Sequence, residues 1–370
     1  PYMGTRGRSS NAVKYIGDNF PISKADIFSV FIEKCFSWLI PNGYSSIVTP
    51  ESWMFISSYE KLRGVLLEQY MFTSLIHLGF GAFECGFGTV ILSIGAHKSS
   101  NHKCKYINLS DIENKELGYE NCDTKTTYIK DQNAFLEIPS HPIAYWVTNR
   151  VISIFCNFDK ISDYGNTRQG MATSDNKRFL RNWYEVIKSK IEFNNMGTSK
   201  KKWFPYNKGG GFRKWYGTAC EIINWENDGQ EVKEYAASLY GSYTRTIKNI
   251  NDYFMESLAW PYISSNARFG ARYQPRGFIF DVAGSSFFTK SNNIYYFCGL
   301  LSSKVAISFM RIINPTMNYQ VGDVARIPVI ISIKSKKQDI DKMVKTNIER
   351  AKTDWDAFET SWDFKKHPLL

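Results

Sequence analysis

Residues 71–95 read MFTSLIHLGFGAFECGFGTVILSIG, and they contain two apolar runs, Thr73 to Leu78 and Thr89 to Ile94. The loop between these runs is rich in glycine and phenylalanine, and it is too short to hold the crossover helix that joins parallel strands. We therefore predict that the two runs are strands that pair antiparallel to each other. Because an antiparallel strand often ends a parallel sheet, we expect this hairpin at the edge of an otherwise parallel sheet.

The chain before this hairpin alternates between helix and strand patterns. Apolar residues recur at helical spacing over 27–39, and a second helical stripe covers 62–69. A short apolar segment at 44–49 lies between them and has the length and composition of a strand. The order helix, strand, helix, strand predicts an α/β half-domain that extends over residues 1–97.

The pattern changes after the hairpin. Residues 98–140 are polar apart from a strand-like segment at 105–108, and we interpret them as a connector. Over 141–335, short apolar runs alternate with Gly, Asn and Ser, and aromatic residues are frequent, which is typical of a mixed α+β domain. A helical stripe at 338–358 predicts a C-terminal helical segment over 336–370. We expect this segment to pack back on the body or to lead to sequence beyond this chain.

The composition is that of a globular protein, with 43% hydrophobic, 22% charged and 16% aromatic residues. The apolar stretches are too short for a membrane-spanning helix, and the residues after Pro1 do not resemble a signal peptide. We therefore expect a piece of a longer protein that is not in a membrane. Seven cysteines are scattered without a C-x-x-C pair, which argues against zinc and disulfide frameworks. We expect no metal site and a cytoplasmic location.

The formal net charge of +11 predicts a polyanionic partner, either nucleic acid or an anionic membrane surface. In one stretch, six cations alternate with aromatic rings and three glycines, and no acid interrupts them. Lysines bind phosphate, rings stack on sugar or base, and glycines let backbone amides approach a phosphate. The alternative is a solvated loop over a hydrophobic patch. The candidate DNA contacts in this stretch are Lys200, Lys201, Lys202, Lys208, Arg213 and Lys214.

Two further groups are candidate DNA contacts. Three arginines stand among Ser, Asn and Gln residues, which are types able to read base edges in the major groove, and the alternative is that they pair with acids elsewhere. The segment 168–181 carries the second group, and the alternative there is the start of a capped helix. The candidates are Arg268, Arg272 and Arg276 in the first group, and Gln169, Lys177 and Arg178 in the second.

The opening pair Pro1-Tyr2 is informative only together with the residues that follow it. A polar loop with glycines, a long helix ending in Pro-Asn-Gly, a strand and then Pro50 come next. This order resembles the second half of the S-adenosylmethionine-dependent amino-methyltransferases, a Rossmann-like α/β fold whose catalytic loop reads Asn-Pro-Pro-Tyr. The resemblance implies that Pro1 and Tyr2 are the last two residues of that loop, and that residues 1–97 are the distal half of the methyltransferase sheet.

In this fold, the tyrosine of that loop stacks on an adenine that has been flipped out of the duplex, because chemistry on a base requires access to it. The resemblance places a second aromatic wall in the loop before the last hairpin strand. Phe83 is our candidate for it, and Phe80 and Phe87 are its rivals. The alternative is that all three rings pack in the core, although three phenylalanines in eight residues amid four glycines are more typical of a shaped loop.

Five segments carry a closer resemblance, to the PglX-type adenine-specific DNA methyltransferases of the BREX and Pgl phage-defence systems. The segments are QGMATSDNKRFLRNWYE at 169–185, KWFPYNKGGGFRKWYG at 202–217, FIFD at 278–281, NPTMNYQVGD at 314–323 and SWDFKKHPLL at 361–370. The glycine-rich cofactor loop of this family and its ribose-binding acid are not among these 370 residues. We therefore assign no cofactor-binding residue.

The resemblance implies a fragment of a site-specific DNA adenine N6-methyltransferase, in which residues 141–335 are the target-recognition domain. The intact protein would take its methyl group from S-adenosylmethionine, bind double-stranded DNA and work with other phage-defence proteins. We expect the fragment alone to be inactive. One alternative is a noncatalytic DNA-binding specificity module that works with a separate catalytic chain. Another is an RNA methyltransferase, which uses the same catalytic loop.

Overall fold

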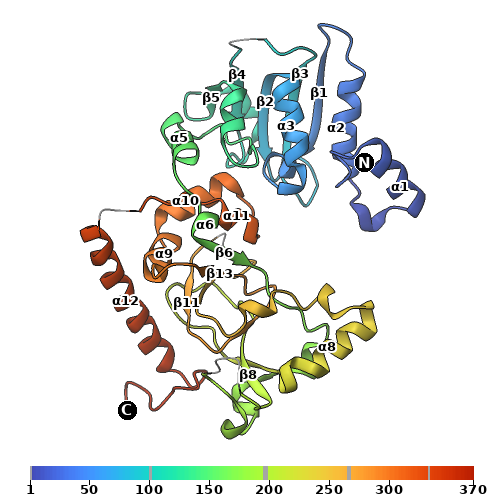
Figure 1. Ribbon diagram of the computed structural model, residues 1–370. Coiled ribbons are helices and arrows are strands. Elements are labelled where there is room, and N and C mark those ends of the chain that lie inside the picture. The colour runs from blue at the N-terminus through green and yellow to red at the C-terminus, as the bar shows by residue number, and fades with distance from the viewer. Residues whose placement is uncertain (1, 100–101, 195–198, 265–267, 332–333) are drawn as a thin grey trace. The chain divides into compact units, whose positions relative to one another are not determined.

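The structure is a computed structural model that describes residues 2–99, 102–194, 199–264, 268–331 and 334–370. The chain folds into two compact units, which are coloured in chain order in Figure 1. The first unit comprises Pro1–Asn157 with Ile312–Asn314, and the second comprises Phe158–Arg311 with Pro315–Leu370. This division does not coincide with the boundaries expected at 97, 140 and 335.

The first unit is built on a five-stranded sheet in the order β1-β3-β2-β4-β5. β2 and β3 pair antiparallel, with Leu75 opposite Leu92, which confirms the predicted hairpin. β4 lies parallel beside β2, and β5 lies antiparallel beside β4, so the segment expected as a connector extends the sheet. The strands are β1 (Tyr44–Pro50), β2 (Met71–Gly79), β3 (Thr89–Gly95), β4 (Cys104–Asn108) and β5 (Thr127–Lys130).

The hairpin does not lie at the edge of the sheet, so that prediction was wrong. β3 is inserted between β1 and β2 and runs antiparallel to both. Burial gives the physical reason, because the side chains of Val90, Leu92 and Ile94 on β3 are fully buried. A strand that is apolar and covered gains most from a central position, where both of its edges have hydrogen-bonded partners.

The helices of the first unit match the predicted helical stripes. α2 (Ile27–Ser37) covers the first stripe and α3 (Glu60–Gln69) covers the second. Asp26 caps α2, because its side chain accepts a hydrogen bond from the backbone N–H of Phe28. This cap fixes the start of α2 next to the loop that follows Tyr2. The remaining helices of this unit are α1 (Ser10–Asn19), α4 (Lys115–Glu120) and α5 (Asn149–Asn157).

The second unit contains two four-stranded sheets, and both are short-stranded and largely antiparallel. One has the order β11-β10-β13-β6, and the other has the order β12-β8-β9-β7, in which β12 and β8 are parallel. This arrangement agrees with the predicted mixed α+β texture. The strands are β6 (Gly165–Arg168), β7 (Leu180–Asn182), β8 (Trp203–Asn207), β9 (Glu221–Asn224), β10 (Ser257–Ala259), β11 (Arg272–Gln274), β12 (Ile279–Phe280) and β13 (Ser286–Thr289).

The predicted C-terminal helix is α12 (Lys334–Asp356), and it packs back on the second unit. A Cβ added at Gly299 of α9 would come within 2.9 Å of the Val344 side chain of α12, so a glycine allows the two helices to approach closely.

No single described helix is both long and apolar enough to span a bilayer. The pair α9 and α10 reaches that length only when both helices are counted together, and the pair is bent by 66°. The other helices are α6 (Ile161–Tyr164), α7 (Asn176–Phe179), α8 (Glu226–Tyr240), α9 (Ile294–Leu301), α10 (Lys304–Ile313) and α11 (Val321–Ala325).

Candidate nucleic-acid interface

The loop that carries Tyr2 is held by two charged side chains. Asp26 accepts a hydrogen bond of 3.0 Å from the backbone N–H of Met3. Arg8 donates from Nε to the carbonyl oxygen of Met3, and from its two Nη atoms to the carbonyl oxygens of Lys24 and Ala25, each at 3.0 Å. These hydrogen bonds therefore hold the loop against residues 24–26. The Tyr2 side chain stays 52% exposed, and Pro1 lies outside the described residues.

The Tyr2 ring contacts Phe87 and not Phe83, our first candidate for the second aromatic wall. The centroids of the Tyr2 and Phe87 rings are 5.2 Å apart, and their planes meet at 60°. Phe80 and Phe83 are 63% and 51% exposed, so they do not pack in the core. The glycine-rich loop thus presents three aromatic rings at its surface or close to Tyr2, and Phe87 is the one already in contact.

A chain of three polar side chains lies under this loop, and the sequence analysis missed it. The Oε2 atom of Glu51 is 2.7 Å from Nε2 of His77, and Nδ1 of His77 is 2.9 Å from the hydroxyl of Tyr145. Burial, more than any neighbouring charge, raises the pKa of Tyr145, so its hydroxyl stays protonated. The sequence signal that points to this site is a single histidine inside the apolar strand β2.

Gly88 connects this polar chain to the aromatic loop. A Cβ added at Gly88 would lie 2.3 Å from the carboxylate of Glu51, so this position has no space for a side chain. The backbone N–H of Glu51 also donates to the carbonyl oxygen of Gly88 at 2.9 Å. The end of the aromatic loop is therefore fixed to the segment that directly follows β1.

The described residues of this unit do not form a nucleotide-binding turn. Such a turn needs a parallel strand, a glycine loop and then a helix. β1 instead continues through Pro50 into the short helical turn Glu51–Met54, and β2 continues through its glycine loop into the antiparallel β3. β4 is followed by α4, but residues 109–114 between them contain no glycine. None of these connections fits S-adenosylmethionine, so none of these residues is assigned to holding it.

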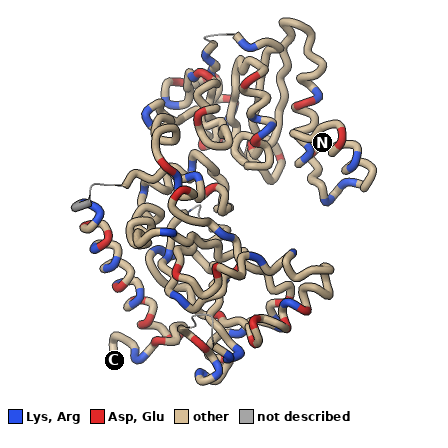
Figure 2. The backbone as a smooth tube through the Cα atoms, in the orientation of Figure 1, with Lys and Arg blue, Asp and Glu red and all other residues tan. Residues whose placement is uncertain are grey.

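In the second unit, the lysine run at 200–202 lies at the surface beside β8. Lys200 is exposed. Lys201 lies 3.5 Å from Glu192, and Lys202 lies 3.5 Å from Glu226. Exposed ion pairs at this distance contribute only about 0–1 kcal/mol, so a phosphate can replace these partners. Figure 2 shows Lys and Arg positions gathered around β8, whereas they alternate with acids along α12.

Three cations of the same stretch have partners within the protein. Lys208 lies 2.6 Å from Asp281, which is 1% exposed and also accepts a hydrogen bond from the hydroxyl of Tyr206. Arg213 pairs with Asp354, and its guanidinium lies 5.2 Å from the centre of the Trp355 ring. The third cation, Lys214, donates to the carbonyl oxygen of Ser302 at 2.6 Å, and burial lowers its pKa.

Arg272 is not at the surface, which corrects its expected role as a base-reading residue. Its residue exposure is 1%, and its guanidinium donates to the carbonyl oxygens of Gly209 and Gly211. Burial, followed by the charge of Arg213, lowers the pKa of Arg272 to about 10. The arginine therefore holds the glycine loop in place and does not reach a DNA base in this conformation.

The other two arginines of that group are exposed. Within the described part of the chain, the side chains of Arg268 and Arg276 make no ion pair. Their expected polar neighbours at 265 and 266 lie outside the described residues. Arg268 and Arg276 thus keep the exposure that reading a base edge requires.

The candidate contacts in segment 168–181 divide in a similar way. Lys177 is exposed, whereas Arg178 pairs with Glu231 at 2.8 Å and lies over the Phe179 ring. Gln169 is half-buried, and its carbonyl oxygen accepts a hydrogen bond from Asn249. The capped helix start weighed as the alternative is also present, since Asp175 caps α7. A cap and an exposed lysine are compatible in one segment.

Comparisons with known proteins agree with the sequence resemblance. The family model of the Eco57I restriction-modification methylases matches residues 1–83. Over 380 residues, the chain is 37% identical to the adenine-specific methyltransferase BrxX of Escherichia coli O9:H4 (strain HS). Over 393 residues, it is 32% identical to the adenine-specific methyltransferase PglX of Lacticaseibacillus casei (strain Zhang). Both alignments cover 100% of this chain, which spans 30% and 32% of these two relatives.

A solved structure shares the fold. The type IIL restriction-modification enzyme MmeI, solved in complex with DNA, superposes with a TM-score of 0.64 at 14% identity. The superposition covers 98% of this chain and 50% of MmeI. The predicted fold class, a methyltransferase-type α/β sheet followed by a mixed α+β domain, is therefore confirmed.

The burial of Arg272 leads to a prediction about stability. Arg272→Met removes the donors to two loop carbonyl oxygens, and an unsatisfied buried group costs about 1–3 kcal/mol. We expect the free energy of unfolding of the second unit to fall by about 2–6 kcal/mol, as measured by urea denaturation. Arg268→Met and Arg276→Met are the matched controls and should change it by less than about 0.5 kcal/mol. An Arg272→Met protein as stable as these controls would show that the guanidinium does not support the loop.

Proposed function

The chain is homologous over its whole length to part of the adenine-specific methyltransferases BrxX and PglX, and on that basis we propose that it belongs to a site-specific DNA adenine N6-methyltransferase. In the intact protein, this activity would mark host DNA in a phage-defence system, so that unmarked phage DNA can be told apart. The observation that carries the proposal is the half-exposed Tyr2 ring beside Phe87, at the end of a loop that Asp26 and Arg8 hold in place.

The chemistry explains why such a ring is needed. The amine of adenine is a poor nucleophile, because its lone pair is delocalised into the ring, and inside a duplex it cannot be reached. The base must be extruded and then held, and an aromatic face holds any base by stacking. Tyr2 would cover one face of the extruded adenine, and Phe87 or Phe83 would cover the other. S-adenosylmethionine would supply the methyl group in the intact protein.

The second unit would position double-stranded DNA. Its exposed cations suit two different tasks, because lysine is a compact point charge for phosphate and arginine is a planar fork that matches a guanine edge. Lys177 and the run at 200–202 would contact the backbone, and Arg268 and Arg276 would contact bases. Other proteins of the same defence system are the proposed partners, and the cytoplasm is the proposed location.

The proposed activity can be tested in a bacterium that carries the intact gene. Sequencing of its genomic DNA for modified adenines should show N6-methyladenine at one recurring site, and deletion of the gene should remove these marks. Marks that persist after deletion would contradict the methyltransferase proposal. If the marks also depend on a second gene for a catalytic chain, the protein is instead a DNA-binding specificity module.

The stacking role of Tyr2 can be tested in the intact protein. Tyr2→Ala should lower the rate of methyl transfer by roughly 5-fold to 150-fold, since stacking contributes about 1–3 kcal/mol per base. Duplex binding should change little, because phosphate contacts hold the duplex before flipping. Phe87→Ala and Phe83→Ala, compared in the same single-turnover assay, identify the second wall.

Tyr119 is the matched control for this series, since it is 51% exposed and lies in the same unit. Tyr119→Ala should leave both rate and binding unchanged. If Tyr2→Ala transfers the methyl group at the unmodified rate, Tyr2 is not in the base pocket.

The two kinds of cation in the second unit should differ in a salt titration. Replacing Lys200, Lys201 and Lys202 with Ala should weaken binding to all duplexes alike, and flatten the dependence of log K on log salt by up to about 0.9 for each phosphate that is no longer bound. Arg268→Ala or Arg276→Ala should cost about 1–3 kcal/mol on the methylated site and little on scrambled DNA. Loss of site preference in the lysine variant, with preference kept in the arginine variants, would reverse this assignment.

A further inference from the structure

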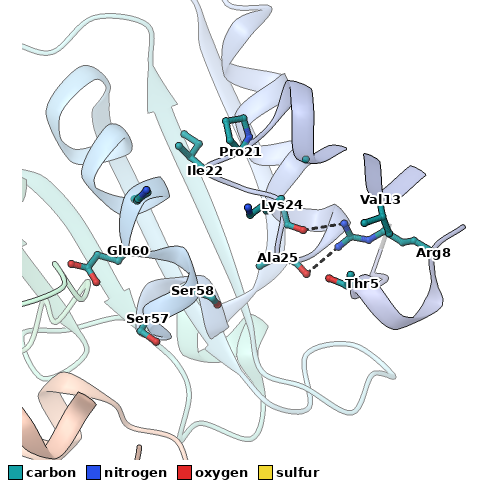
Figure 3. A pocket seen from close by; sticks show the side chains of 12 residues that line it. Thr5, Arg8, Val13, Pro21, Ile22, Lys24, Ala25, Ser57, Ser58 and Glu60 are labelled. Carbon is teal, nitrogen blue, oxygen red and sulfur yellow. Dashed lines mark hydrogen bonds between the residues drawn. The ribbon is translucent and has the colours of Figure 1, made fainter. Parts of the chain in front are cut away.

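A groove with a volume of about 810 Å³ lies in the first unit, close to the Tyr2 loop. Three segments line it, and Figure 3 shows their side chains: the start of the chain with α1, residues 21–25 before α2, and the turn that leads into α3. Among the lining residues are Thr5, Arg8, Lys24, Ser57, Ser58 and Lys61. The volume falls in the range of ligand-binding pockets, which is roughly 300–1,000 Å³.

Several hydrogen-bond donors and cations of the groove have no partner within the described part of the protein. Lys24, Lys61 and Ser58 are exposed, and among the described residues their side chains make no hydrogen bond or ion pair. Arg8 adds a third positive charge, although its donors are occupied by backbone carbonyl oxygens. The acid in the lining is Glu60, whose carboxylate accepts a hydrogen bond from Ser140 and points away from Arg8 in Figure 3. Such a set of groups favours an anionic ligand with oxygen acceptors.

The wall of this groove is the same loop that carries Tyr2. Arg8 lines the groove, and its Nε atom donates to the carbonyl oxygen of Met3, the residue after Tyr2. Thr5 lines the groove three residues after Tyr2. The groove is therefore lined by the same loop that presents Tyr2, and in DNA the groups on either side of a flipped base are phosphodiesters.

We propose that this groove binds the phosphodiester backbone of the DNA strand that carries the target adenine, with Lys24 and Lys61 as charge partners and the hydroxyls of Ser57 and Ser58 as donors. The inference rests on the proposed function. Contacts of this kind orient a strand without reading its sequence, because phosphates are the same at every position. Their task is to hold the flanking phosphates while the base turns towards Tyr2.

The test uses the intact protein and a duplex that contains the methylated site. Lys24→Ala combined with Lys61→Ala should weaken binding and flatten the slope of log K against log salt by about 0.9 for each phosphate that the protein no longer neutralises. The matched control is Lys14→Ala combined with Lys105→Ala, which removes two exposed lysines of the same unit outside the groove and should keep the unmodified slope. Thermal melting checks that both double variants are folded.

A second measurement places the contact at the flipped base. Uncharged methylphosphonates at the phosphates that flank the target adenine should weaken binding of the unmodified protein and cause no further loss in the Lys24/Lys61 variant. Equal losses in both proteins, or equal salt slopes in the two double variants, would overturn the inference. Competition by millimolar inorganic phosphate, without an effect of the methylphosphonates, would assign the groove to a free anion and overturn it as well.

These outcomes are separate from the fate of the proposed function. An unmodified protein that binds the duplex but transfers no methyl group to adenine would contradict the proposed function and leave the salt slopes interpretable. An unmodified protein that methylates the site, while the Lys24/Lys61 variant behaves like its control, would contradict the groove alone.

Discussion

The buried guanidinium of Arg63 holds together the part of the first unit on which the candidate site depends. Arg63 is fully buried, and it donates to the carbonyl oxygens of Trp53 and Ile56 on one side and Ser140 on the other. Removing a cation from water is costly, and only several good hydrogen bonds offset that cost. The hydrogen bonds of Arg63 connect the turn after β1 to the end of the chain segment that follows β5. The serines of the groove and the carboxylate of Glu51 lie on this tied turn.

A series of close contacts connects that turn to the aromatic loop and restricts the loop's conformation. The Glu51 carboxylate is held by His77, whose ring is held by Tyr145, and Gly88 packs directly on the carboxylate. The loop that ends at Gly88 presents Phe87 to Tyr2. The position of the second aromatic ring is thus decided by polar groups on three different segments. In the proposed function, an aromatic ring that is already fixed in place would lower the ordering cost of holding a base.

Local features of the fold could be predicted from the sequence, whereas its long-range pairings could not. The spacing of apolar residues predicted α2, α3 and α12, and the short loop predicted the β2–β3 pairing, because both signals act within a few residues. The insertion of β3 beside β1 depends on partners that lie far away in the sequence, such as Tyr44 opposite Gly95, and no local signal encodes it. Arg272 was misread for the same reason, since its acceptors, Gly209 and Gly211, lie far away in the sequence.

The net charge of +11 overestimates the number of cations that are available to a polyanionic partner. The cations differ in the free energy needed to release them from their partners within the protein. The Lys202–Glu226 pair is exposed and loose, so a phosphate can take the place of the carboxylate at little cost. Lys208 cannot be freed in this way, because its departure would leave the buried Asp281 carboxylate without a cation. In the proposed complex, DNA should therefore engage the exposed cations first and leave Lys208 and Arg272 in place. The basic residues of the second unit thus form two groups: buried or paired cations that support the interior, and exposed cations that are available to phosphates in the proposed function.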